Sequence, residues 1–271
     1  MPSARAVAAL PMYDWPEIRP ATDALWALVA EGLARRGLLA PERLDRGRTA
    51  DEIWRDPRLV LSQTCGYPLA IQYRDVLRPV AAPVFGAAGC ERGRYRSFIV
   101  AAKGSGIRDL AGADGRRLAV NAAHSQSGHN ILRYELAAAG LAGLAFSKVV
   151  VTGAHRRSLQ ALAKGEADIA AIDCVCFALA ARHDPAVVER VEIVAQTADA
   201  PALPYVTAAA ASPQTAEAIR EALAEAVASP AAETIRAALL LAGVEPVSLG
   251  DYDEIVAQER AATAASVARF A

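Results

Sequence analysis

Short apolar runs alternate with longer amphipathic segments through most of this chain. The apolar runs are typical of buried strands, and they span residues 6–10, 59–61, 76–82, 97–102, 118–120, 148–151, 168–172, 191–194 and 205–210. Helical periodicity spans residues 18–36, 67–73, 128–139, 156–164, 174–181, 213–228, 231–241 and 251–270. The alternation predicts an α/β fold with mostly parallel strands flanked by helices.

Two extended stretches, 94–102 and 204–210, stand far apart in the sequence. If they cross side by side, the chain has an outer, discontinuous lobe made of 1–100 plus 205–271 and an inner lobe made of 101–204. Ligands of such folds bind at the carboxyl ends of strands and between lobes, so we expect the ligand cleft there.

Composition restricts the partners. The chain has 271 residues, of which 54% are hydrophobic, and a net charge of −1. No basic tract occurs, so we expect no nucleic-acid partner. No apolar run approaches the roughly 20 residues that span a bilayer, so we expect no membrane insertion.

The apolar stretch 6–10 is too short for a signal-peptide core and is interpreted as the first strand. The protein is then periplasmic if a leader has been removed, and otherwise cytoplasmic. The four cysteines (Cys65, Cys90, Cys174 and Cys176) lack the spacing of a metal knuckle and are interpreted as small buried side chains. A Cys65–Cys90 disulfide would require an oxidising compartment.

The strand at 118–120 runs into a turn that is rich in groups able to bind an anion. Ser125 and Ser127 offer hydroxyls, Gln126 an amide, and the backbone around Gly128 unpaired N–H groups at a predicted helix start. A helix start carries partial positive charge, which favours a phosphate-like or carboxylate ligand.

Other polar turns follow the predicted strands. They contribute Tyr13, Gln63, Thr64, Tyr67, Asn121, His155 and Asp173 as candidate ligand-binding residues. Each alone is explained by capping or packing. Convergence of several such turns at one sheet edge would instead make a site of mostly neutral donors for a small anion.

Catalysis is less well supported. A nucleophilic catalytic triad could be built from Ser125 or Ser127, from His129 or His155, and from Asp173 as the orienting residue. However, Ser-Gln-Ser-Gly does not match the G-x-S-x-G nucleophile elbow. His124 and His129 are five residues apart, which does not place two metal ligands on one helical face. We therefore predict no catalytic residue, metal or cofactor.

The chain resembles the phosphate/phosphite/phosphonate-binding family of ABC-transporter solute receptors, which has the two-lobed type 2 periplasmic-binding-protein fold. The resemblance lies in the stretch 95–103, the lead-in 109–120, the loop Ser125-Gln-Ser-Gly128, and Thr152-Gly-Ala-His155 with the block 159–173 that follows. It departs at Gln126, where the family usually has a small hydroxyl residue, and at Arg156, where it often has an acidic one.

The resemblance implies that Ser125, Gln126 and Ser127 hold the anionic head of the ligand and that His155 donates to it. It further implies that Asp173 faces an amine or another substituent, that Tyr13, Gln63 and Tyr67 contribute from the outer lobe, and that ABC-transporter membrane subunits are partners. Two alternatives stay open: a cytosolic enzyme on the same fold acting on a small carboxylate, as in menaquinone synthesis, or a detached ligand-sensing domain.

Overall fold

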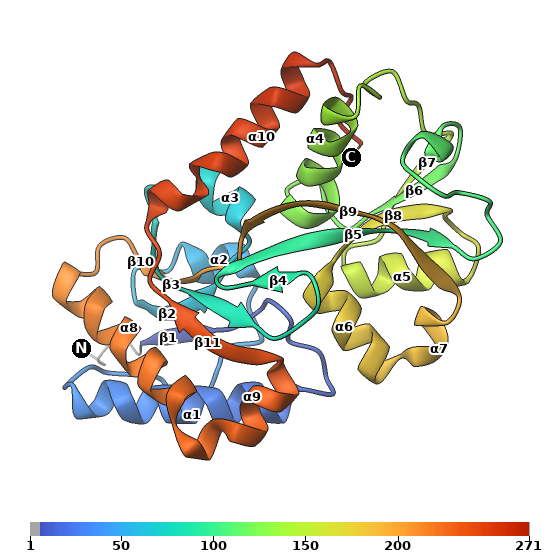
Figure 1. Cartoon of the computed structure of the whole chain (residues 1–271). Helices are drawn as coiled ribbons and strands as arrows, with labels where there is room; N and C mark the ends of the chain where they lie inside the picture. Colours follow the sequence, from blue (N-terminus) through green and yellow to red (C-terminus); the bar gives the residue numbers. More distant parts are fainter. Residues whose placement is uncertain (1–5, 271) are drawn as a thin grey trace. The chain divides into compact units, whose positions relative to one another are not determined.

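The computed structural model describes residues 6–270 (Figure 1). The chain forms two compact units, each with its own sheet. The first unit contains residues up to Gly86, Glu91–Gly93 and Pro201–Tyr252, and the second contains Ala87–Cys90, Arg94–Ala200 and the chain from Asp253 onward. The α/β class predicted from the sequence is confirmed.

The sheet of the first unit is mixed. Its strand order is β1 (Val7–Ala9), β2 (Leu59–Gln63), β10 (Tyr205–Ala208), β3 (Leu77–Phe85) and β11 (Leu241–Glu245). β1 and β2 are parallel, whereas β10 is antiparallel to both of its neighbours and β11 is antiparallel to β3. The prediction of mostly parallel strands is therefore wrong for this sheet, because β10 and β11 return from later parts of the chain in the opposite direction.

The helices of the first unit are α1 (Arg19–Arg35), α2 (Ala50–Trp54), α3 (Gly66–Ile71), α8 (Pro213–Ala228) and α9 (Glu233–Leu239). α1 buries Leu25, Val29 and Leu33, which recur every four residues and so share one face. α1 and α8 approach closely, since a Cβ on Gly32 would lie 3.1 Å from the Ala222 Cβ. Ser212 caps α8 by accepting a hydrogen bond from the Thr215 N–H, with Pro213 at the first position, as the sequence predicted.

The sheet of the second unit is built around β5 (Arg94–Ala102), β8 (Ile169–Asp173), β6 (Arg117–Val120) and β7 (Lys148–Val151), with β4 (Cys90–Glu91) and β9 (Val191–Pro201) on β5. β6 is parallel to both β7 and β8, while β5 is antiparallel to β8. Because β6, β7 and β8 run in the same direction, the turns that follow them lie at one edge of the sheet. Asn121 and Thr152 lie in the turns after β6 and β7, and Asp173 is the last residue of β8.

The C-terminal segment belongs to the second unit, whereas we predicted 205–271 in the outer lobe. A π-helical turn (Gln126–Asn130) leads into α4 (Ile131–Ala138), and α10 (Asp253–Ala264) packs against α4. Ala262, Val267 and Phe270 complete a buried core with residues of β5, β6 and α4. Burial of these side chains explains the correction. The other helices of this unit are α5 (His155–Ala163), α6 (Cys174–His183) and α7 (Pro185–Val188).

Two predicted helices end differently. The helix predicted over 231–241 ends as α9 at Leu239, and Leu241 begins β11 after Leu240 adopts a left-handed conformation with φ 56°. The helix predicted to reach residue 270 ends at Ala264. The short elements α2, β4 and α7 were not predicted.

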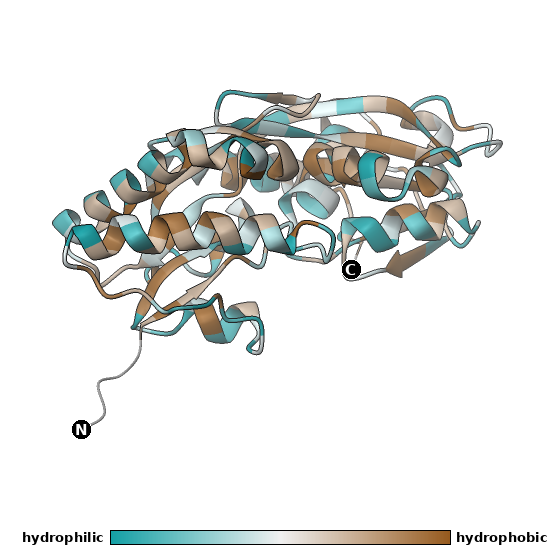
Figure 2. Cartoon of the chain, turned by 90° about the horizontal axis from the view of Figure 1, so that it is seen from below, coloured by the Kyte–Doolittle hydropathy of each residue, from teal (hydrophilic) through white to brown (hydrophobic). Residues whose placement is uncertain are grey.

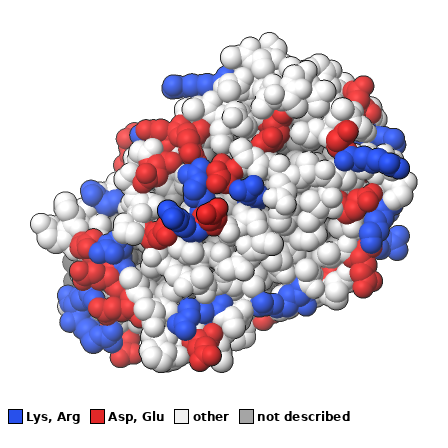
Figure 3. Space-filling model, viewed as in Figure 1, with Lys and Arg blue, Asp and Glu red and all other residues white. Residues whose placement is uncertain are grey.

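The distribution of hydropathy follows this architecture. Figure 2 shows strands that are mostly hydrophobic and helices on which hydrophilic and hydrophobic positions alternate. On the face shown in Figure 3, acidic and basic side chains are interspersed. Within the described residues, no helix is long and apolar enough to cross a membrane.

Candidate functional site

The loop after β6 is shaped by Ser125. This residue is the N-cap of the π-helical turn, and its hydroxyl oxygen accepts a hydrogen bond from the Gly128 N–H at 3.0 Å. The turn therefore starts at Gln126, two residues before the predicted helix start. Ser125, Gln126 and Ser127 are all buried. Single π turns are frequent at functional sites, because the extra residue redirects side chains and N–H groups.

Ser127 faces His155 across the edge of the sheet. The Ser127 Oγ lies 2.8 Å from the His155 Nε2, and the Asn121 Nδ2 lies 3.3 Å from the same nitrogen. The carbonyl of Ser127 accepts a hydrogen bond from the Ser97 hydroxyl of β5 at 2.8 Å. The structure thus brings together three residues that the sequence predicted as ligand contacts, and it adds Ser97, which the sequence did not single out.

Gly128 is the residue that allows this approach. A Cβ at this position would lie 1.9 Å from the Asn121 Oδ1 and 3.2 Å from the His155 Cε1. The Asn121 Oδ1 is buried without a hydrogen-bond partner. A buried acceptor of this kind is costly unless something pairs with it, so a donor on a ligand or a water molecule would be favoured here.

His155 occupies the first position of α5 and is buried. Burial lowers its pKa to about 4, and a main-chain interaction with Ala171 opposes the shift only in part. The imidazole is therefore neutral at pH 7, with one nitrogen able to donate and the other able to accept. Together with the hydroxyls and the N–H groups of the turn, it makes a set of donors without a formal charge.

Gln126 has a role that the sequence did not predict. Its Nε2 donates to the Gln258 Oε1 of α10 at 2.6 Å, and its Oε1 accepts from the Asn130 Nδ2 at 2.7 Å. Asn130 also donates to the Ile255 carbonyl. The side-chain amide expected to hold the anion is engaged at both ends in tying the loop to α10. The predicted contact of this side chain with a ligand stays a prediction.

This network gives the first testable prediction. Changing Gln258 to Met keeps the length of the side chain but removes the acceptor for the buried Gln126 amide. An unpaired buried amide costs about 1–3 kcal/mol, so we expect the free energy of unfolding to fall by about that amount in urea denaturation. Gln160→Met in α5 is the control, and an equal loss in both variants would contradict the role of the network.

Asp173 ends β8 and caps α6. One carboxylate oxygen accepts hydrogen bonds from the Val175 N–H at 2.7 Å and from the Cys176 N–H at 3.1 Å. In the sheet register Asp173 lies opposite Ser97. Capping is thus an established role of this side chain, and the predicted contact with a ligand substituent stays a prediction.

Four predicted site residues lie in the first unit. Gln63 ends β2 and donates to the Leu203 carbonyl at 3.1 Å. Tyr13, at φ 59°, packs edge-on against Phe85 with ring centroids 5.4 Å apart. Tyr13 and Gln63 line one small cavity. Thr64 lies in the turn before α3, Tyr67 is the second residue of that helix, and both are buried.

The sequence offered no signal for Ser97 or Gln258. Each is an ordinary polar residue in a predicted strand or helix, and its partner in the loop lies about 30 or 130 positions away in the sequence. Among the described residues, no group of three or more histidine, cysteine, aspartate or glutamate side chains is placed to hold a metal ion.

Comparison with known proteins decides the family. Residues 59–252 match the model of a family described as the periplasmic substrate-binding protein of ABC phosphonate transporters. The chain belongs to this family. It is a family of substrate-binding proteins and not of enzymes. No match was found among curated protein sequences.

Solved structures agree with the fold of this phosphonate-binding family. A binding protein component of an ABC phosphonate transporter from Pseudomonas aeruginosa (PA3383) superimposes with a TM-score of 0.77 at 15% identity, covering 96% of this chain and 87% of the other. PhnD1 from Prochlorococcus marinus in complex with methylphosphonate gives a TM-score of 0.72 at 15% identity, covering 94% and 97%. XAC2383 from Xanthomonas citri bound to ATP gives 0.71 at 17% identity, covering 97% and 98%. These likenesses establish the two-lobed type 2 fold.

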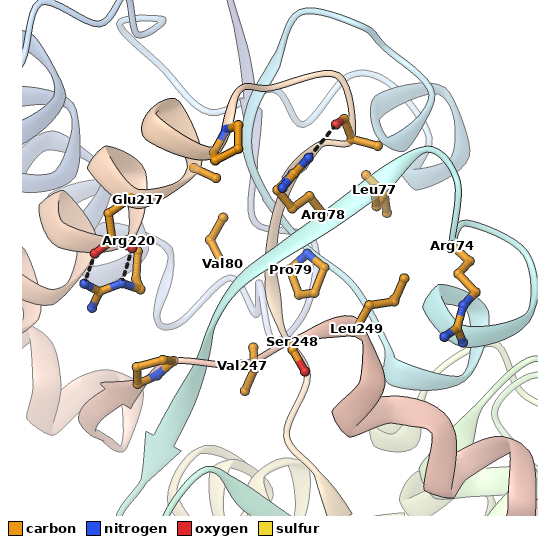
Figure 4. Close-up of a pocket in the computed structure, with 14 residues that line it drawn as sticks. Arg74, Leu77, Arg78, Pro79, Val80, Glu217, Arg220, Val247, Ser248 and Leu249 are labelled. Carbon is orange, nitrogen blue, oxygen red and sulfur yellow. Dashed lines mark hydrogen bonds and ion pairs between the residues drawn. The ribbon is translucent and has the colours of Figure 1, made fainter.

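The first unit of this phosphonate-family protein also contains a wider groove, of about 530 Å³ (Figure 4). β3, the start of α8 and the segment 246–249 line it. Arg78 donates to the Ala209 carbonyl at 3.2 Å, and Arg220 pairs with Glu217. No predicted ligand-binding residue lines this groove. Its prolines, valines and arginines differ from the hydroxyl-rich loop of the second unit, which remains the candidate anion site.

Proposed function

We propose that this protein captures a phosphonate or a closely related phosphorus oxyanion with the loop Ser125–Gly128. The observation that carries the proposal is the contact between the Ser127 hydroxyl and the neutral His155 ring at the end of β6. A tetrahedral oxyanion offers several acceptor oxygens, and this loop offers several donors close together. Membership of the phosphonate-binding family supports the same ligand class.

The donors would act without a full counter-charge. The Ser127 Oγ and the His155 Nε2 are hydrogen-bonded to each other. An oxyanion placed between them would accept a hydrogen bond from each, and N–H groups of the turn would add to these bonds. Hydrogen bonds to a charged partner contribute about 1.5–3 kcal/mol each, so a few of them suffice for tight binding.

We further propose that the protein acts in the periplasm and delivers its ligand to the membrane subunits of an ABC transporter. This rests on the family, whose members are periplasmic components of such transporters. The enzyme hypothesis is not favoured, because the family consists of substrate-binding proteins and because both side chains of the Ser127–His155 pair serve equally well as ligand donors.

A thermal-shift experiment tests the ligand class. The purified protein is heated with methylphosphonate, phosphite, phosphate, sulfonates and small carboxylates in parallel. A ligand at a hundred times its Kd stabilises the folded state by about 2.7 kcal/mol, which corresponds to a rise of roughly 5–10 °C in Tm for a chain of this size. We expect such a rise for the phosphorus oxyanions alone.

Variants then locate the site. Ser127→Ala should weaken binding of the active oxyanion roughly 10- to 100-fold, because it removes one hydrogen bond to a charged ligand. Ser147→Ala, an exposed serine of the same unit, should bind like the wild type. A Tm shift produced only by carboxylates would reject the proposed ligand class, and unchanged binding in Ser127→Ala would reject the proposed site.

A further inference from the structure

Two of the four cysteines approach each other in the second unit. The Sγ atoms of Cys90 and Cys174 lie 3.3 Å apart, although the residues are 84 positions apart in the sequence. Cys90 lies in β4 and is partly exposed, whereas Cys174 begins α6 and is buried. Both cysteines are thiols in this structure. The sequence analysis named Cys65 as a possible disulfide partner of Cys90, but Cys65 belongs to the other unit.

The backbone around Cys90 is built for this approach. Gly89 has φ +90°, and a Cβ there would lie 2.9 Å from the Cys174 Cβ and 3.1 Å from the Phe98 ring. Only a glycine lets the turn come this close to the start of α6. The Cys90 N–H donates to the Ala87 carbonyl and the Arg96 N–H donates to the Gly89 carbonyl, which holds the turn against β5.

We propose that Cys90 and Cys174 are a site of reversible disulfide formation. The two sulfurs need to move only about 1 Å closer to reach the length of a disulfide bond. Cys90 is the accessible member and meets the oxidant first, while Cys174 is protected by burial and acts second. The site is separate from the anion loop, and its existence does not depend on the proposed ligand.

The reaction balances with a small-molecule disulfide such as oxidised glutathione as the oxidant. The Cys90 sulfur attacks one glutathione sulfur, forms a mixed disulfide and releases one glutathione thiol. The Cys174 sulfur then attacks the Cys90 sulfur, its proton passes to the departing glutathione, and the second glutathione thiol leaves. The protein loses two hydrogens, and the oxidant is reduced to two thiols.

The chemical environment favours this order of steps. The hydrogen bond to Cys90, together with burial, raises the pKa of the Cys174 thiol, so Cys174 stays protonated until its partner is activated. Nucleophilic attack requires a thiolate, which makes a buried, protonated thiol a poor first attacker. The periplasm, where members of the family act, is an oxidising compartment.

The bond would fasten β4 to the start of α6. The chain passes from the second unit to the first within β4, since Ala87–Cys90 belongs to the second unit and Glu91–Gly93 to the first. Asp173 directly precedes Cys174 and caps α6. Oxidation would therefore fix this connecting segment to the helix that the candidate ligand contact Asp173 caps, and it would close a long loop in the unfolded chain.

The test uses the full chain equilibrated with oxidised or reduced glutathione, then alkylated and digested without reduction. We expect a cross-linked peptide that contains Cys90 and Cys174, lighter than the sum of its parts by two hydrogen atoms. Closing a loop of this length should raise Tm by roughly 5–10 °C in the oxidised sample. Dithiothreitol should reverse both effects.

Variants separate this pair from the other thiols. Cys90→Ser, at a partly exposed position, should abolish both the cross-link and the oxidation-dependent rise in Tm, whereas Cys65→Ser and Cys176→Ser should keep them. Cys174→Ser provides the same test from the buried side. The proposal is overturned if oxidation leaves only separate glutathione adducts, if it links other cysteines, or if the rise in Tm persists in Cys90→Ser.

Discussion

Replacing Gly128 by alanine should weaken binding of the phosphorus oxyanion by about a hundredfold or more. The new methyl group would overlap the Asn121 Oδ1, which lies 1.9 Å from the Cβ position, and would crowd the His155 ring. Neither neighbour can move freely, since Asn121 and Ser127 both contact the His155 Nε2. Overpacking of about 3 kcal/mol in a binding loop corresponds to roughly that loss of affinity. Isothermal titration calorimetry with methylphosphonate measures it.

Matched variants make the interpretation specific. Gly143→Ala, at an exposed position with open space around its Cβ, should bind normally. Removing the obstructing amide in the double variant Gly128→Ala/Asn121→Ala should recover part of the affinity, so that the two substitutions are not additive. Normal binding by Gly128→Ala would mean that the loop around Ser127 is not where the anion is held.

The fold could be predicted largely from local patterns. Buried strands such as β6 and β8 are continuous apolar runs. The start of α8 is indicated by the N-cap residue Ser212 followed by Pro213. β11 could not be separated from the preceding helix, because its residues Leu-Ala-Gly-Val-Glu continue an alanine-rich segment and pair with β3 from far along the chain. Local propensity does not contain such pairing information.

Several residues of the candidate site could be predicted from the sequence, but the hydrogen bonds that connect the loop to the rest of the unit could not. The alternation of strand and helix is enough to place Asn121, Ser127 and His155 at one sheet edge. The bond between Gln126 and Gln258 depends on α10 packing into the second unit, and that depends on the burial of Val267 and Phe270. The close approach of Cys90 to Cys174 likewise needs the β4 turn, which has no clear signal in the sequence.

Acidification should destabilise this protein through two buried histidines. Burial lowers the pKa of both His129 and His155 to about 4, and the positive charges of Arg133 and Arg269 add to the effect at His129. In the unfolded chain a histidine titrates near pH 6.5. Between about pH 6.5 and pH 4 the unfolded chain therefore binds more protons than the folded one, and the free energy of unfolding falls as the pH falls.

The lowered pKa values of the two histidines set the size of this loss of stability. Each histidine contributes stability that is fully present above about pH 6.5 and is lost as the pH falls to about 4, and the loss is about 3 kcal/mol per histidine. His129 accepts a hydrogen bond from the Phe270 N–H at 3.2 Å, so its protonation would also release the C-terminal segment from the loop. We expect that segment to become accessible to hydrogen exchange before the rest of the second unit.

Urea denaturation at several values between pH 7.5 and pH 4.5 measures the slope. Carboxylates contribute to the same acid limb, so the informative quantity is the difference between the wild type and the variants. His129→Gln and His155→Gln should each have a shallower dependence on pH than the wild type, even if they are less stable at pH 7. His124→Gln, at an exposed histidine, should keep the wild-type dependence. If all four proteins lose stability in parallel, the histidines are not the groups that couple protonation to unfolding, and the acid sensitivity lies with the carboxylates.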